Sequence, residues 1–93
     1  MIIREVTLRS NDPEGLEFLW GNKYKKTLER QKGFVQAFLL KLKDEDEIYQ
    51  MLLMFESEQL AGDWRASSEH NVLSPQLANV ASVVKVEVFF VAE

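Results

Sequence analysis

The chain contains no cysteine and only one histidine, His70. Without cysteine there can be no disulfide, no thiolate metal site and no cysteine nucleophile. A single histidine cannot build a histidine-rich metal cage, although it could still serve as one axial ligand. We therefore expect no metal ion held by a cluster of side chains, and no cofactor.

Long apolar runs and an excess of positive charge are also missing. No stretch of about 18 apolar residues is present, and the segment 1–5 lacks the long apolar core of a signal peptide. The formal net charge is −4 at pH 7, which argues against a nucleic-acid surface because such a surface needs clustered cations. We expect a soluble cytoplasmic protein that binds neither nucleic acid nor membrane.

What remains is the composition of one small globular domain. The 93 residues are 46% hydrophobic and 28% charged, a balance that is typical of a folded chain. A chain of this length buries a modest fraction of its surface on folding. We therefore expect a single domain over residues 1–93.

The first part of the sequence predicts a strand followed by a helix. Residues 2–8 are rich in β-branched side chains and predict the first strand. Asp12 followed by Pro13 is a strong helix start, with a carboxylate cap and a proline in the first position. Apolar residues then recur at spacings of three and four from Leu16 to Leu28. Gly33 stands where a left-handed residue would end the helix.

The rest of the chain completes an α+β pattern. Further strands are expected at residues 34–42, 47–55 and 82–91. Ser57 is expected to cap a second helix, and the pair Ser74-Pro75 to start a short third helix through about residue 80. The order β-α-β-β-α(α)-β is the ferredoxin-like plan, with one antiparallel four-stranded sheet.

Both faces of the predicted strands are substantially apolar. In the third strand Leu52 and Met54 point to one face, while Leu53 and Phe55 point to the other. Short helices cannot cover both faces, and each large side chain left in water forfeits about 1.5–3 kcal/mol. The simplest cover is a second copy of the same sheet, so we expect a homodimer. The pattern leaves open which face meets the partner.

The segment from Met54 to His70 carries a recognisable motif. An apolar strand ends in Phe55-Glu56-Ser57, and the helix that follows bears Trp64, a serine pair and Glu69-His70. This pattern resembles the antibiotic-biosynthesis-monooxygenase group of the dimeric α+β barrel superfamily. The resemblance implies a two-subunit barrel and a small oxygenase that needs no bound metal or flavin. It also implies a small aromatic or apolar ligand, with Trp64 beside a cavity between the helices and the sheet.

Trp64 and His70 are the candidate catalytic residues. The alternative interpretation of Trp64 is simple core packing beside Leu60 and Ala61. His70 has the only side chain with an unperturbed pKa near neutrality, so it is the natural general acid or base; it could equally be a surface or capping residue. Six residues on one helix place two side chains about 120° apart. Trp64 and His70 can therefore share a face only if the helix breaks near Ser67.

Oxygenases of the family that act on quinol-type compounds hold an anionic phenolate while it reacts with oxygen. A dry pocket with hydrogen-bond donors is what such a reaction requires. The candidate substrate-binding residues are donors of this kind: Arg4, Tyr49, Arg65 and Asn71. The sequence thus predicts a cofactor-independent monooxygenase acting on an aromatic or quinol-type compound.

Two alternatives remain open. One is a non-catalytic dimer of the same fold that binds a small ligand. The other is a haem-binding or haem-degrading protein, since relatives of that kind resemble this chain in fold. Those relatives use an asparagine on the first strand, where this sequence has Arg4 or Glu5, so the haem reading is the weaker of the two.

Overall fold

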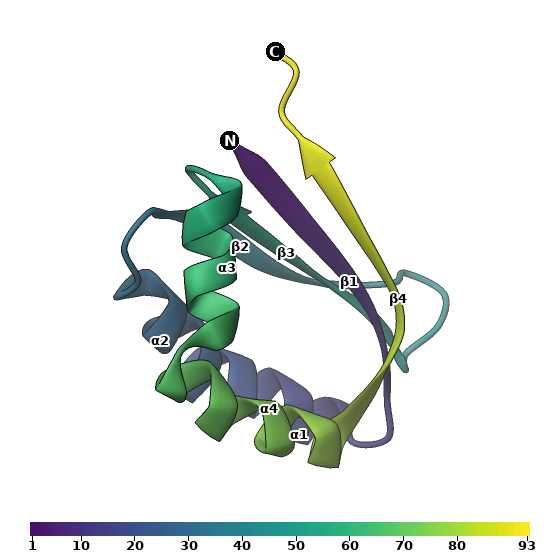
Figure 1. The fold of residues 1–93 in the computed structure, drawn as a ribbon. Helices are drawn as coiled ribbons and strands as arrows, with labels where there is room; N and C mark the ends of the chain where they lie inside the picture. The colour runs from purple at the N-terminus through teal and green to yellow at the C-terminus, as the bar shows by residue number, and fades with distance from the viewer.

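The protein is built on one antiparallel sheet. The computed structural model describes residues 1–93, and its four strands lie in the order β2-β3-β1-β4. The strands are β1 (Ile2–Ser10), β2 (Phe34–Lys41), β3 (Ile48–Phe55) and β4 (Ala81–Phe90). The two central strands, β1 and β3, pair with one another, and the two ends of the chain lie at the same end of the sheet (Figure 1). The predicted ferredoxin-like α+β fold is confirmed.

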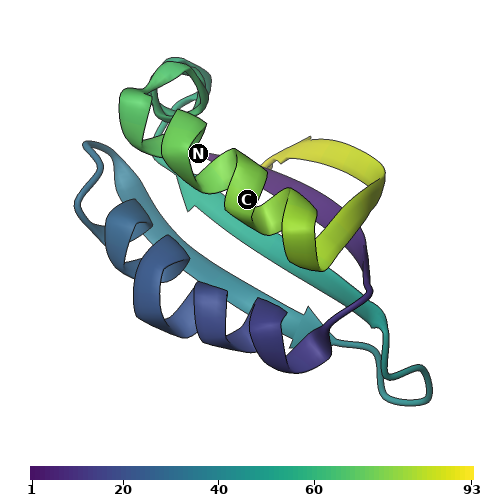
Figure 2. The same ribbon diagram turned by 90° about the horizontal axis from the view of Figure 1, so that it is seen from below.

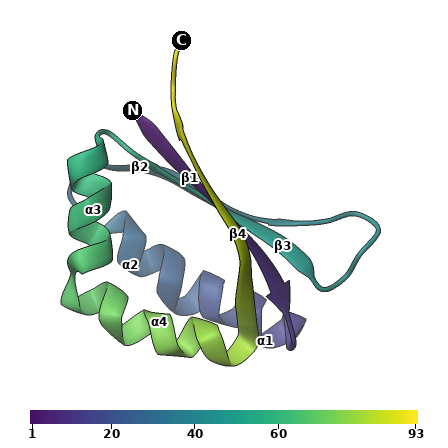
Figure 3. The same cartoon turned by 45° about the vertical axis from the view of Figure 1, so that its right-hand side comes forward.

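All helices lie on one face of this sheet (Figures 1 and 3). The first helical rod consists of α1 (Pro13–Leu19), a π-helical turn η1 (Trp20–Tyr24) and α2 (Lys25–Glu29). After β3 come α3 (Glu58–Ala66) and α4 (Ser68–Val80). Figure 2 shows α4 lying beside the first rod, so that the two form a layer over the sheet. The opposite face carries no helix.

The predicted helix ends are confirmed where a local signal defines them. The Asp12 carboxylate accepts a hydrogen bond from the Gly15 backbone N–H at 3.0 Å. The Ser57 hydroxyl accepts one from the Leu60 N–H at 3.2 Å. These contacts satisfy backbone groups that a helix end leaves without partners. Gly33 has the expected left-handed φ of +80°, but it does not end the helix as predicted: α2 ends at Glu29, and Gly33 lies in the turn before β2.

The third predicted helix begins in the wrong place. The pair Ser74-Pro75 was expected to start it, but α4 begins at Ser68 and Pro75 lies inside it. Ser67 is the true cap, because its hydroxyl accepts from the His70 N–H at 3.1 Å. Proline lacks an N–H and so leaves the carbonyl of Asn71 without its helical partner. Both residues are exposed, so water can bond that carbonyl instead.

The first helix also departs from the regular stripe that the spacing predicts. The Lys25 N–H bonds the carbonyl of Trp20, five residues earlier, which widens the turn at η1. The wider turn leaves both Trp20 and Tyr24 buried, with their rings stacked at a centroid distance of 5.6 Å. Tyr24 is thereby directed toward the sheet.

The core lies between the helices and the covered face of the sheet. Residues of β1 and β3 alternate between the two faces, so Leu53 is buried at 4% exposure while its neighbour Leu52 lies on the helix-free face. The helix-free face is also apolar at one end, where its members are Ile3, Phe38, Leu52, Met54 and Phe89. Phe38 and Phe89 are 49% and 46% exposed. The structure thus shows which face of the sheet the helices leave uncovered.

None of the helices is long and apolar enough to cross a membrane.

Candidate functional site

A cavity of about 210 Å³ lies between the helical layer and the sheet. Its lining comes from both central strands, β4 and three helical segments, and most of it is apolar. The lining residues are Arg4, Val6, Tyr24, Met51, Leu53, Trp64, Arg65, His70, Ser74, Leu77, Val83 and Val86. Four of the six site residues expected from the sequence are therefore brought together here. None of the lining residues is acidic.

Trp64 is both a core residue and a wall of the cavity. It is 3% exposed and its ring meets the edge of Tyr24 at a centroid distance of 5.9 Å. The two interpretations offered by the sequence, packing and cavity lining, are thus both true of this side chain. Its indole Nε1 is buried but has no hydrogen-bond partner in the chain. Buried indole N–H groups usually find a partner, so this donor is an exception within the core.

His70 reaches the same cavity because the helix breaks at Ser67. Ser67 has an extended backbone (φ −72°, ψ 154°), which ends α3 and starts α4 in a new direction. The rings of Trp64 and His70 consequently meet edge to face, with centroids 5.1 Å apart. The sequence predicts that Trp64 and His70 share a face only if the helix breaks near Ser67, and the structure has this break. The His70 Nδ1 is also buried and without a partner.

The surroundings of His70 favour its neutral form. Burial lowers the pKa of His70 below its usual 6.5, and the charges of Arg4 and Arg65 lower it further. At pH 7 the imidazole is therefore neutral and can accept a proton from a ligand.

Two arginines face this imidazole from opposite sides of the core. Arg4 lies on the covered face of β1 between Leu53 and Val88, while Arg65 lies in the last turn of α3. Burial, and then the charge of Arg65, lowers the pKa of Arg4 from its usual value. Burial raises the pKa of Tyr24 to about 12, although the charge of Arg4 acts against this shift. The tyrosine is thus a neutral hydrogen-bonding group.

Tyr49 and Asn71, also expected to bind substrate, lie outside the cavity. Tyr49 is on the same face of β3 as Leu53, but four residues further along the strand, which is about 13 Å. Its hydroxyl donates to the Glu17 carboxylate. Asn71 is exposed on α4, because the residue after His70 points about 100° away. Their role in substrate binding stays a prediction that this geometry does not support.

Sequence reasoning missed the part of the lining that comes late in the chain. Ser74 and Leu77 on α4, with Val83 and Val86 on β4, close the cavity. Ser74 was taken as a helix cap, and the valines looked like ordinary strand residues. A helix starting at Ser68 would have placed His70, Ser74 and Leu77 on one side, at spacings of four and three.

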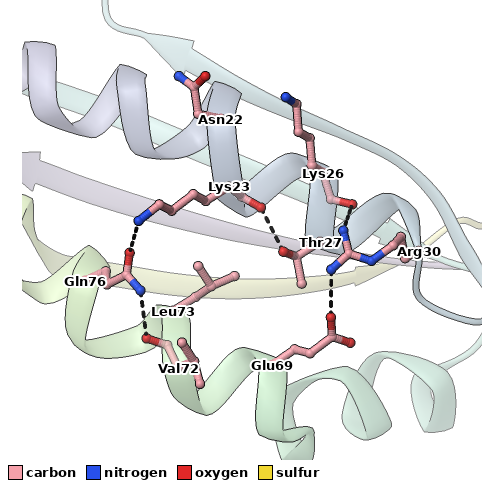
Figure 4. Close-up of a pocket in the computed structure, with 9 residues that line it drawn as sticks. All are labelled: Asn22, Lys23, Lys26, Thr27, Arg30, Glu69, Val72, Leu73 and Gln76. Atoms are coloured by element: carbon pink, nitrogen blue, oxygen red, sulfur yellow. Dashed lines mark hydrogen bonds and ion pairs between the residues drawn. The ribbon is translucent and has the colours of Figure 1, made fainter.

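A second, larger hollow of about 390 Å³ lies on the outside, between the first helical rod and α4 (Figure 4). Its lining is mostly polar: Asn22, Lys23, Lys26, Thr27, Arg30, Glu69, Val72, Leu73 and Gln76. Its polar groups already bond one another, since Arg30 pairs with Glu69 at 2.8 Å and Lys23 donates to Gln76 at 3.3 Å. We read this hollow as a seam that ties α4 to the first rod. The structure holds no group of three or more His, Cys, Asp or Glu side chains that could bind a metal ion.

The fold and the cavity together define a small α+β protein with a largely apolar cavity between its helices and its sheet. No family model matches the sequence, and no curated protein matches it. Solved structures match it closely in fold. SnoaB from Streptomyces nogalater, described as a cofactor-independent oxygenase, has a TM-score of 0.90 and 16% identity over 99% of this chain and 93% of its own.

Two further structures give the same result. HapK from Hahella chejuensis has a TM-score of 0.85 and 14% identity over 97% of this chain and 91% of its own. A candidate antibiotic biosynthesis monooxygenase from Caulobacter crescentus has a TM-score of 0.81 and 14% identity over 99% of this chain and 91% of its own. At these identities the likeness establishes the fold. The resemblance to antibiotic biosynthesis monooxygenases expected from the sequence is confirmed at that level.

Proposed function

We propose that this chain is a cofactor-independent monooxygenase acting on an electron-rich phenol or quinol. One observation carries the proposal: Trp64, whose indole N–H has no partner within the chain, and a neutral His70 line the same largely apolar cavity as Arg4 and Arg65. The description of SnoaB as a cofactor-independent oxygenase agrees with it. A cytoplasmic location, expected from the sequence, remains part of the same proposal.

The reaction requires little from the protein except an anion in a dry site. His70 takes the phenolic proton, and Arg4 and Arg65 stabilise the resulting phenolate. The electron-rich anion then passes an electron to oxygen. One oxygen atom bonds to a ring carbon, the other leaves as water, and the phenol becomes a quinone. Trp64 and Tyr24 wall the ring and exclude water.

Oxygen uptake tests this directly. Metal-free protein should consume oxygen with members of a panel of quinols and anthrones, and chelators should not change the rate. Trp64→Phe keeps an aromatic wall but removes the N–H, so we expect at least a tenfold loss of rate. A tenfold loss corresponds to about 1.4 kcal/mol, the scale of one hydrogen bond.

Trp20→Phe is the matched control, because Trp20 is a buried tryptophan that does not line the cavity. It should retain most of the activity. Oxygen uptake no faster than in buffer across the whole panel would replace this function with the non-catalytic ligand-binding alternative.

We also propose that the active form is a homodimer whose sheets face one another. The support is the helix-free face, where large apolar side chains such as Phe38, Leu40 and Phe89 are more than 40% exposed. A patch of this kind is typical of an interaction surface.

A further inference from the structure

The two arginines of the cavity have no counter-ion in the chain. The protein has four arginines, and the other two are paired: Arg9 with Glu47 at 2.6 Å and Arg30 with Glu69 at 2.8 Å. Arg4 and Arg65 form neither an ion pair nor a hydrogen bond within the chain. Among the four arginines, the two without a partner are therefore the two that line the cavity.

The two charges also lie close enough to affect one another. The charge of Arg65 opposes that of Arg4, and both act on His70. Arg4 is half-buried and Arg65 is exposed, so an anion that joins them would gain most from the partly desolvated Arg4. One phenolate balances only one of the two guanidinium groups. When the phenolate balances one guanidinium group, the other guanidinium group still lacks an anion.

The remainder of the cavity is shaped for a small flat ring. Its walls are aromatic at Tyr24 and Trp64 and aliphatic at Leu53, Leu77 and Val86. The volume of about 210 Å³ lies between the roughly 150 Å³ that holds a benzene and the roughly 300 Å³ at which pockets for drug-sized ligands begin. One ring or two fused rings fit that space.

We propose that the cavity binds a one- or two-ring aromatic hydroxy-carboxylate, with its carboxylate held by Arg4 and Arg65 and its hydroxyl directed to His70. A guanidinium group binds a carboxylate through two parallel N–H bonds, which favours arginine over a simple point charge. The ring lies against Trp64 and Tyr24. This inference rests on the proposed function, because it names the substrate class of the same site.

Binding of 1-hydroxy-2-naphthoate, measured by calorimetry without turnover, tests the inference. The neutral amide 1-hydroxy-2-naphthamide has nearly the same shape and should bind at least tenfold more weakly. Arg4→Gln and Arg65→Gln should each weaken the carboxylate at least tenfold and leave the amide unchanged. Arg65→Lys, which keeps the charge but loses the fork, should fall between wild type and Arg65→Gln. Anthracene-2-carboxylate should bind more weakly than the naphthoate.

Arg9→Gln is the matched control, because Arg9 pairs with Glu47 away from the cavity, and it should bind the naphthoate as wild type does. Thermal unfolding shows that each variant is folded; Arg65 is exposed on α3, so its variant tests the idea even if Arg4→Gln unfolds. Equal affinity for the acid and the amide would overturn the inference. It would also be overturned if sulfate competed for the cavity as strongly as the hydroxy-acid does. Tight naphthoate binding without oxygen uptake would refute the proposed reaction and leave this inference standing.

Discussion

At the scale of single residues, the cavity depends on a histidine held neutral by its neighbours. Burial disfavours the charged imidazole, and two cations reinforce that preference. No carboxylate lines the cavity to reverse it. A neutral His70 can accept a proton at pH 7, whereas a charged one could not. The same arrangement makes the stability of the protein depend on pH.

The pH dependence has a definite sign. Because the pKa of His70 is lower when folded than the usual 6.5, the unfolded chain binds more protons on acidification. The contribution of a neutral His70 is complete above pH 6.5 and is lost as the pH falls below that value. His70→Gln cannot titrate, so the free energy of unfolding of wild type minus that of the variant should decrease from pH 7 to pH 5. Urea unfolding at several pH values measures this difference, and an increase would contradict the placement of His70.

The same residue leads us to expect no haem turnover. Its ring is packed edge-on against Trp64, its Nδ1 is buried, and the first strand presents Arg4 rather than the asparagine of haem-degrading relatives. Titration with haemin under a reductant should give no loss of the Soret band beyond a protein-free control. Tight one-to-one binding that disappears in His70→Ala, with pigment formation, would reverse this expectation.

At the scale of elements, the turn between α3 and α4 assembles the site. The extended backbone at Ser67 redirects the chain so that Trp64 and His70 meet. The start of α4 is held from outside as well, because Arg30 and Gln31 both bond the Glu69 carboxylate, at 2.8 and 2.9 Å. These contacts join the first turn of α4 to the first helical rod beside the hollow in Figure 4.

Removing the cap at this turn should change His70 as well as stability. Ser67→Ala loses the bond to the His70 N–H, and loss of a helix cap typically costs about 0.5–2 kcal/mol. We expect the pKa of His70, followed by NMR of the imidazole, to move back toward 6.5 as the ring loosens from the cavity. Ser57→Ala removes the equivalent cap of α3. It should cost a similar amount of stability and leave that pKa unchanged; the same change in both variants would argue against a special role for the turn.

The elements also show what the sequence could and could not predict. Asp12 and Ser57 act through neighbours within a few residues, so the sequence predicts their roles as helix caps. Gly33 takes the expected left-handed conformation, but the helix has already ended at Glu29. The sequence did not predict the start of α4 correctly. A proline is usually found in the first turn of a helix, whereas Pro75 lies in the interior of α4.

The candidate site also has one part that the sequence predicts and one part that it does not. Trp64, His70, Arg4 and Arg65 were predicted from residue type and from the family motif, and they do meet in the cavity. Tyr49 was misplaced because the sequence does not show at which end of β3 the cavity lies, and Val83 and Val86 were missed because only the packing of β4 brings them there. Contacts between distant parts of the chain decide both.

At the scale of the whole molecule, one face of the sheet is complete and the other is not. Helices cover the first face, while the second leaves Ile3, Phe38, Leu52 and Phe89 without cover (Figure 3). The polar residues of that face bond within it: the Gln50 amide donates to Glu5 at 2.9 Å. A second copy would bury the apolar end without stranding these polar groups.

Substitutions at two neighbouring leucines distinguish a loss of dimer assembly from a loss of folding. Light scattering on the wild-type peak should give twice 10.8 kDa. Leu52→Arg puts a charge on the helix-free face, where it would be buried without a partner only in a dimer, so the variant should elute as a folded monomer. Leu53→Arg puts the same charge into a core position that is 4% exposed and should unfold the chain. Circular dichroism distinguishes the two outcomes. A wild-type monomer at micromolar concentration, or a dimer that survives Leu52→Arg, would show that this face does not join two copies.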